Sequence, residues 1–130
     1  MKFNKTIPEL PVFNLEQSKQ FYLDVLKFKV EYERLEEHFV FLSKDGNQVM
    51  LEEIHDSGWN TAELTYPLGR GINLSFEISA IDSFYQEIVS KEVPLFREIT
   101  ISRYEGADGL IVQKEFLIQD PNGYLLRFTD

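Results

Sequence analysis

Two short stretches, FYLDVL at residues 21–26 and FYQEIV at residues 84–89, begin with two aromatic residues and end with two aliphatic ones. Each lies in a segment whose apolar residues recur at helical spacing, which predicts an amphipathic helix. Asn14 stands where it can cap the first helix, and Ser79 and Asp82 are expected to form a capping box at the second. A Phe-Tyr pair is common in such helices, so the similarity of the two helices could by itself be a coincidence.

The segments around the first helix read as strands. TIPELPVF (6–13) precedes it as an edge strand, because Pro8 and Pro11 cannot donate to a ladder. Three strand-like segments follow it: KVEYER (29–34), HFVFLS (38–43) and QVMLEEI (48–54). KDGN (44–47), between the last two, predicts a tight hairpin turn.

The same order returns around the second helix. A strand-like segment precedes it, INLSFEIS (72–79), and three follow it: VPLFREITISRY (93–104), LIVQKEFLIQ (110–119) and GYLLRFTD (123–130). The turn sequence DPNG (120–123) corresponds to KDGN in the first half. Agreement of helix pattern, turn and element order favours an internal duplication of a βαβββ unit. We therefore expect a single domain over residues 1–130, with modules at about 1–56 and 71–130 and a linker at about 57–70.

Composition narrows the class of protein. The chain has 130 residues, no cysteine and a net charge of −9, which argues against thiolate sites and against a nucleic-acid partner. No apolar run approaches the roughly 20 residues of a membrane span, and the first residues lack the apolar stretch of a signal peptide. We expect a cytoplasmic protein with no membrane partner.

The chain resembles the vicinal oxygen chelate superfamily, which includes glyoxalase I, dioxygenases and bleomycin resistance proteins. The resemblance is carried by the two βαβββ units, by NLEQSKQFY directly after a strand and by the final DPNGYLLRF. The resemblance implies an α+β fold in which the modules form a curved, mostly antiparallel, barrel-like sheet with helices outside. It also implies a metal position on each of four strands. These positions fall at Ile7, Glu52, Asn73 and Arg127 in this chain.

Only one of these four residues suits a hard divalent cation, because an aliphatic carbon has no lone pair, an amide oxygen is a weak ligand and a guanidinium is cationic. We therefore expect no metal, no cofactor and no catalytic residue. Arg127 is expected to point into the cavity and to pair with a carboxylate such as Glu52 or with an acidic ligand group; the alternative is that it reaches solvent at the rim. His38 and His55 are interpreted as surface residues at strand ends.

The nearest resemblance is to bleomycin resistance proteins, carried by IPELPV, HFVFL, the Gly58–Trp59 pair and KEFLIQDPNG. It implies a homodimer whose interface grooves sequester a cationic, aromatic antibiotic by stacking and acidic charge, without catalysis. In the segment ISRYEGADGLIVQKEF (101–116), where those proteins carry further aromatic residues, this chain offers only Tyr104. A ligand other than bleomycin is therefore expected almost as strongly as bleomycin itself.

Strand alternation predicts which side chains face the cavity. The candidate ligand-binding residues are Phe39, Phe41, Met50, Glu52, Trp59, Asn73, Ser75, Glu77, Tyr104, Glu115 and Arg127. Trp59 lies in a polar linker, where it either fills the core or meets a partner. Two alternatives stay open: a metal-dependent glyoxalase-like lyase or transferase, and a domain with only an interaction role, such as a dimeric regulator.

Overall fold

The structure, a computed structural model, describes residues 1–130 and contains two four-stranded mixed sheets. The first sheet has the order β1-β4-β3-β2 and the second the order β5-β8-β7-β6. In each, the strand before the helix pairs in parallel with the last strand of its half, and the other pairs are antiparallel. The predicted α+β fold is confirmed, with two open sheets rather than a closed barrel.

The elements of the first half follow the predicted order. They are β1 (Glu9–Val12), α1 (Leu15–Gln20), the π-helical turn η1 (Phe21–Val25), β2 (Lys29–Arg34), the 3₁₀ turn η2 (Leu35–Glu37), β3 (Phe39–Lys44) and β4 (Asn47–Glu53). Asn14 caps α1 as predicted, because its Oδ1 accepts a hydrogen bond from Gln17 N at 2.9 Å. The predicted hairpin between β3 and β4 is also present. Asp45 and Gly46 both have positive φ, as a two-residue type I′ turn requires.

The second half contains β5 (Asn73–Glu77), α2 (Ile81–Ser90), β6 (Arg97–Gly106), β7 (Gly109–Gln119) and β8 (Leu125–Thr129). The predicted capping box at α2 is wrong. Ala80 occupies the N-cap position in a left-handed conformation, and no side chain caps the helix. Ser79 instead donates from its backbone N to Asp45 Oδ2 at 3.0 Å, and Asp82 pairs with Lys114 of β7 at 2.8 Å.

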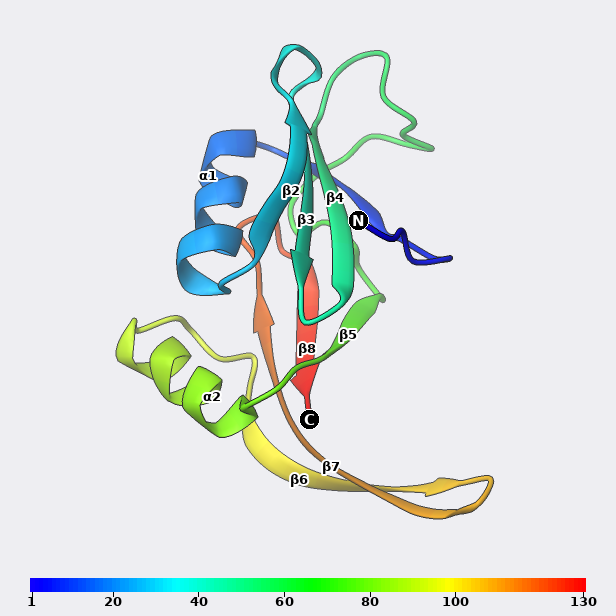
Figure 1. Cartoon of the computed structure of the whole chain (residues 1–130). Coiled ribbons are helices and arrows are strands. Elements are labelled where there is room, and N and C mark those ends of the chain that lie inside the picture. The colour runs from blue at the N-terminus through cyan, green and yellow to red at the C-terminus, as the bar shows by residue number, and fades with distance from the viewer.

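Both helices lie on one side of the molecule, and the residues before β1 lie on the other (Figure 1). A core cluster of 21 buried residues fills the helix side and includes residues of both sheets. Aromatic rings connect the halves: Tyr22 packs on Phe28, Phe28 on Phe76 and Phe76 on Phe128, with centroids 5.5–5.6 Å apart. Such edge-to-face and tilted pairs add to the free energy gained from area burial.

A buried polar joint also connects the halves. Tyr22 OH, beyond α1, donates to Asp120 Oδ2 at 2.9 Å in the turn between β7 and β8. Asn122 of that turn donates to Ser18 Oγ at 3.0 Å, and Tyr124 OH donates to the Pro11 carbonyl at 2.7 Å. Burial raises the pKa of Asp120, although the hydrogen bonds it accepts act in the opposite direction.

The β6–β7 hairpin extends from the rest of the chain as a long curved arm (Figure 1). Ile101, Leu110 and Val112 are exposed on it. None of the helices is long and apolar enough to cross a lipid bilayer.

Candidate functional site

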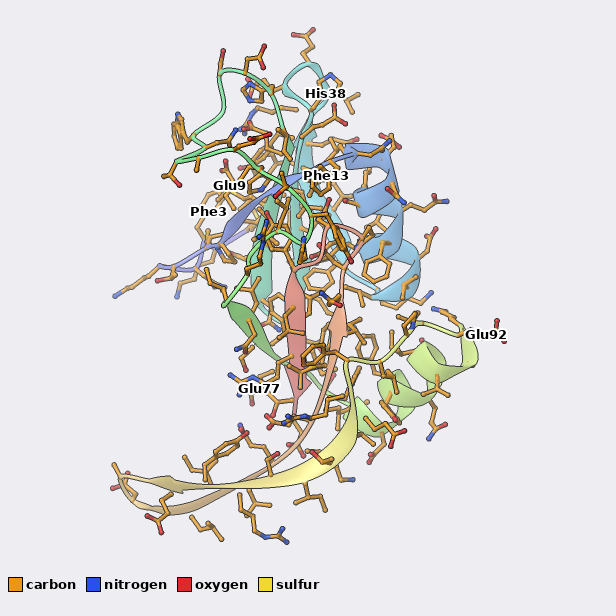
Figure 2. The ribbon with its side chains drawn as sticks, turned by 180° about the vertical axis from the view of Figure 1, so that it is seen from behind. Phe3, Glu9, Phe13, His38, Glu77 and Glu92 are labelled. Carbon is orange, nitrogen blue, oxygen red and sulfur yellow. The ribbon has the colours of Figure 1, made fainter.

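We call the face of each sheet opposite the core its inner face. Val40 and Leu42 belong to the core cluster, so the alternating Phe39 and Phe41 lie on the inner face of the first sheet. Phe39 is opposite Glu52 and Phe41 is opposite Met50 in the strand register. On the second sheet the same alternation places a further set on the inner face, namely Asn73, Ser75, Glu77, Glu115 and Arg127. Figure 2 shows Phe3, Glu9 and Glu77 on the side away from the helices.

The aromatic part of the first inner face is covered by the chain itself. Phe41 is 1% exposed, stacked against Tyr32 at 5.2 Å and met edge-on by Phe3 at 5.5 Å. The Arg34 guanidinium lies 3.8 Å from the ring centroid of Phe39. Neither phenylalanine ring is open to a ligand in this arrangement.

Residues before β1 form part of this cover. Asn4 N donates to Gln48 Oε1 at 2.7 Å, and Gln48 Nε2 donates to the Lys2 carbonyl at 2.6 Å. Asn4 Nδ2 also donates to the Gly46 carbonyl at 2.8 Å. Three hydrogen bonds therefore hold this segment over the inner face of the first sheet.

An open cleft begins where the aromatic cover ends. Met50 and Glu52 of β4 line it together with Trp59 of the following loop, and its volume is about 300 Å³. A neighbouring cleft of about 470 Å³ shares Glu52, Glu53, Ile54 and His55 with it. The larger cleft is lined by Glu36, Glu37, His38, Glu52, Glu53, Ile54 and His55.

Carboxylates dominate the charge of the two clefts. Partial burial and the neighbouring Glu52 raise the pKa of Glu9 on β1. His55 Nε2 lies 3.3 Å from Glu52 Oε2, and His38 Nδ1 lies 3.4 Å from Glu53 Oε2. Both histidines are exposed at strand ends, as expected. The clefts together hold more carboxylates than cationic groups, so they favour a cationic partner.

Trp59 is 95% exposed at the edge of the smaller cleft. The core-filling alternative for this residue is therefore wrong. A large aromatic side chain with nearly its whole surface in water offers a stacking surface beside the acidic residues.

Arg127 on β8 pairs with Glu115 on β7 rather than with Glu52. Its Nη1 lies 3.7 Å from Glu115 Oε2, whereas Glu52 belongs to the other sheet and contacts His55. Glu115 also accepts a hydrogen bond from Tyr104 OH. Burial alone would raise the pKa of Glu115, but the hydrogen bond from Tyr104, the nearby Ser102 hydroxyl and the charge of Arg127 outweigh it and hold the pKa below its usual range.

The predicted residues therefore fall into separate groups. Met50, Glu52 and Trp59 share the cleft of the first sheet, and Tyr104, Glu115 and Arg127 form a cluster on the second sheet. Asn73, Ser75 and Glu77 are exposed along β5, with Ser75 directly beside Arg127 in the register. Phe39 and Phe41 lie beneath the aromatic cover.

The donor set does not fit a divalent cation. Ile7 has no lone pair, and Arg127 places a cation at another of the four expected positions. No group of three or more histidine, aspartate or glutamate side chains in the structure is arranged to hold a metal ion.

Sequence reasoning missed the acidic residues that line the clefts: Glu9, Glu36, Glu37 and Glu53. A usable signal was present. EEH at 36–38 ends where β3 begins, and EE at 52–53 ends β4. Antiparallel pairing of these strands brings both acidic runs to the same end of the sheet.

Comparison with known proteins assigns the family. The family model described as "Glyoxalase superfamily protein" matches residues 1–130. The chain belongs to the glyoxalase superfamily. Bleomycin resistance proteins of Geobacillus stearothermophilus and Staphylococcus aureus are 26% identical to it over 132 aligned positions, which cover 95% of this chain and 94% of theirs.

Solved structures of similar shape support the fold of this superfamily member. A protein from the mobile metagenome of V. Pseudocholerae aligns with a TM-score of 0.71 at 18% identity, covering 99% of this chain and 95% of its own. A protein of unknown function from Agrobacterium tumefaciens aligns with a TM-score of 0.68 at 26% identity, covering 99% and 93%.

Proposed function

We propose that the chain is a cytoplasmic, non-catalytic small-molecule-binding protein that sequesters a cationic, aromatic ligand such as a bleomycin-type antibiotic. The observation that carries the proposal is the cleft in which exposed Trp59 stands beside Glu52 and Met50. An aromatic ring can stack on the indole while a cationic group meets the carboxylates. The similarity to bleomycin resistance proteins supports this ligand class.

A groove completed by a second copy of the chain is part of the proposal. The arm carries the exposed apolar residues Ile101, Leu110 and Val112, and the inner face of β5 is open to solvent. Exposed apolar side chains gathered on one hairpin are typical of protein interfaces. The resemblance to bleomycin resistance proteins implies the same homodimer.

Isothermal titration calorimetry with metal-free bleomycin tests the binding site. We expect micromolar binding that Trp59→Ala weakens about tenfold, because a well-stacked ring contributes roughly 1 kcal/mol or more. Glu52→Gln should weaken binding severalfold, more at low than at high salt. Phe96→Ala and Glu63→Gln are matched controls, since neither residue lines the clefts. Absence of micromolar binding removes bleomycin as the ligand; binding unaffected by Trp59→Ala removes the site.

Two further measurements test the proposed dimer and the proposed absence of a catalytic metal. Sedimentation velocity should show a dimer that Val112→Asp on the arm dissociates and that Val89→Asp on the exposed side of α2 does not. A wild-type monomer at binding concentrations would refute the shared groove. Metal analysis of protein purified without chelator should find no stoichiometric divalent ion; finding one would restore the alternative of a glyoxalase-like lyase or transferase.

A further inference from the structure

In the Tyr104–Glu115–Arg127 cluster of the second sheet, two polar atoms make no hydrogen bond, although one of them, Glu115 Oε2, lies 3.7 Å from Arg127 Nη1 in an ion pair. Glu115 Oε2 and Arg127 Nε are buried and make no hydrogen bond, and they are the only such side-chain atoms in the chain. A buried polar group without a hydrogen bond lowers the stability of the folded state, and more so when it is charged. Native proteins keep few of these groups, so two on neighbouring residues require a reason.

The rest of the cluster is fixed. Glu115 has a side chain only 3% exposed, and its other oxygen accepts from Tyr104 OH. Leu117, paired with Arg127 in the register, is also buried. The carboxylate is thus held in place by one hydrogen bond and by close packing, with its second oxygen directed toward Arg127.

The two residues that contact Glu115, Tyr104 and Arg127, are partly exposed on the inner face. Tyr104 is 41% exposed and the Arg127 side chain is 33% exposed. Ser75, beside Arg127, is exposed, as are Asn73 and Glu77 along the same strand. Movement of the partly exposed Arg127 guanidinium would therefore open the two atoms to the inner face, while the hydrogen bond from Tyr104 still holds the Glu115 carboxylate.

The charges of the cluster select the kind of group that fits. An anion would be attracted by Arg127 but repelled by the Glu115 carboxylate, and a cation would meet the opposite pair of forces. A neutral group that carries an acceptor and a donor side by side avoids both repulsions. A primary carboxamide has this form, because its carbonyl oxygen can accept from Arg127 Nε and its NH₂ can donate to Glu115 Oε2.

We propose that Glu115 and Arg127 bind a neutral carboxamide group of a small-molecule ligand on the inner face of the second sheet. The inference rests on the proposed small-molecule-binding function and extends it from the acidic, aromatic cleft of the first sheet to a second, uncharged part of the ligand. The two inner faces then recognise different chemical groups.

Nuclear magnetic resonance of the ¹⁵N-labelled full chain tests the proposal through the Arg127 Nε–H signal, assigned by its loss in Arg127→Lys. Acetamide is the probe, with acetate and methylammonium at matched ionic strength as comparisons. We expect acetamide to shift this signal saturably and the two ions to leave it in place. An unmoved signal, or an equal shift with acetate, would overturn the proposal.

A pair of variants then assigns the acceptor. Glu115→Gln should weaken acetamide binding about tenfold, since it removes a hydrogen bond to a charged group. Glu105→Gln, on the exposed arm, makes the same charge change outside the cluster and should have no effect. The wild-type titration needs neither variant, so a misfolded Glu115→Gln would not remove the test.

Titration of the same labelled protein with metal-free bleomycin separates this inference from the proposed function. Acetamide binding without bleomycin binding would refute bleomycin as ligand and keep the carboxamide site. Bleomycin binding that depends on Trp59, with no response to acetamide, would refute the carboxamide site and keep the proposed function. No response to either probe would refute both.

Discussion

The two sheets share one strand order but present different inner faces. The first has a buried aromatic surface covered by Tyr32 and Phe3, with an open acidic cleft at its end. The second has exposed polar residues along β5 and a buried charged cluster around Glu115. The core sides, in contrast, are apolar in both. The two sheets therefore share an apolar core side and differ in the chemistry of their inner faces.

The largest expected effect contrasts equivalent faces. Phe41→Ala should lower the free energy of unfolding by about 3–5 kcal/mol, because it leaves a cavity between Tyr32 and Phe3. Ser75→Ala, on the exposed inner face of the second sheet, should change it by less than about 0.5 kcal/mol. Urea unfolding followed by circular dichroism measures both. A loss below 1 kcal/mol for Phe41→Ala would mean that the aromatic cover contributes little.

The two turns give the next contrast. Gly46 has positive φ, and a Cβ added there would meet no atom within 4 Å, whereas a Cβ on Gly123, also at positive φ, would stand 2.5 Å from Pro67 Cβ. Gly46→Ala should cost about 1–2 kcal/mol from the left-handed backbone alone. Gly123→Ala should cost about 2–4 kcal/mol because a steric clash is added. If both variants lowered the free energy of unfolding equally in the same urea experiment, the loop at Pro67 would have to move aside at little cost.

The smallest expected effect concerns pH, because two acids of the second half have oppositely shifted pKa values. Asp120 has a raised pKa, so the folded state gains stability as pH falls through its folded-state pKa toward the unfolded value of about 3.9. Glu115 has a lowered pKa, so its contribution is present above the unfolded value of about 4.3 and is lost as pH falls through its folded-state pKa.

Urea unfolding between pH 6 and 3 should therefore separate the two acids. The stability that Asp120→Asn removes should grow as pH falls, and the stability that Glu115→Gln removes should shrink. Parallel slopes for the two variants would contradict the assigned environments. Glu105→Gln serves as the control for the loss of an exposed acid from the same half.

Local patterns predicted the fold well, since they depend on neighbours in the sequence. The Asn14 cap, the Asp45–Gly46 hairpin and the alternation along β5 each follow from a few adjacent residues. The capping box at α2 failed because Asp45 and Lys114, both distant in sequence, engage Ser79 and Asp82. A long-range contact of this kind leaves no local signal.

The site was predicted less completely. Alternation gave the inner-facing residues, but the partners of those residues depend on how the strands and sheets are arranged. A carboxylate partner for Arg127 was expected, with Glu52 as the example, but the register sets Arg127 opposite Leu117 and diagonal to Glu115, with which it pairs. Phe39 and Phe41 were expected to be accessible because nothing in the pattern shows that Arg34 and Phe3 lie over them.

Trp59 has an optical consequence. It is the single tryptophan of the chain and is almost fully hydrated in the folded state, whereas the tyrosines include the buried Tyr22. Its fluorescence spectrum should hardly change when the protein unfolds. When a ligand binds against the indole ring, the spectrum should shift to the blue and iodide should quench the fluorescence less. Tyrosine absorbance would follow unfolding, so one sample carries separate reporters for occupancy and for melting.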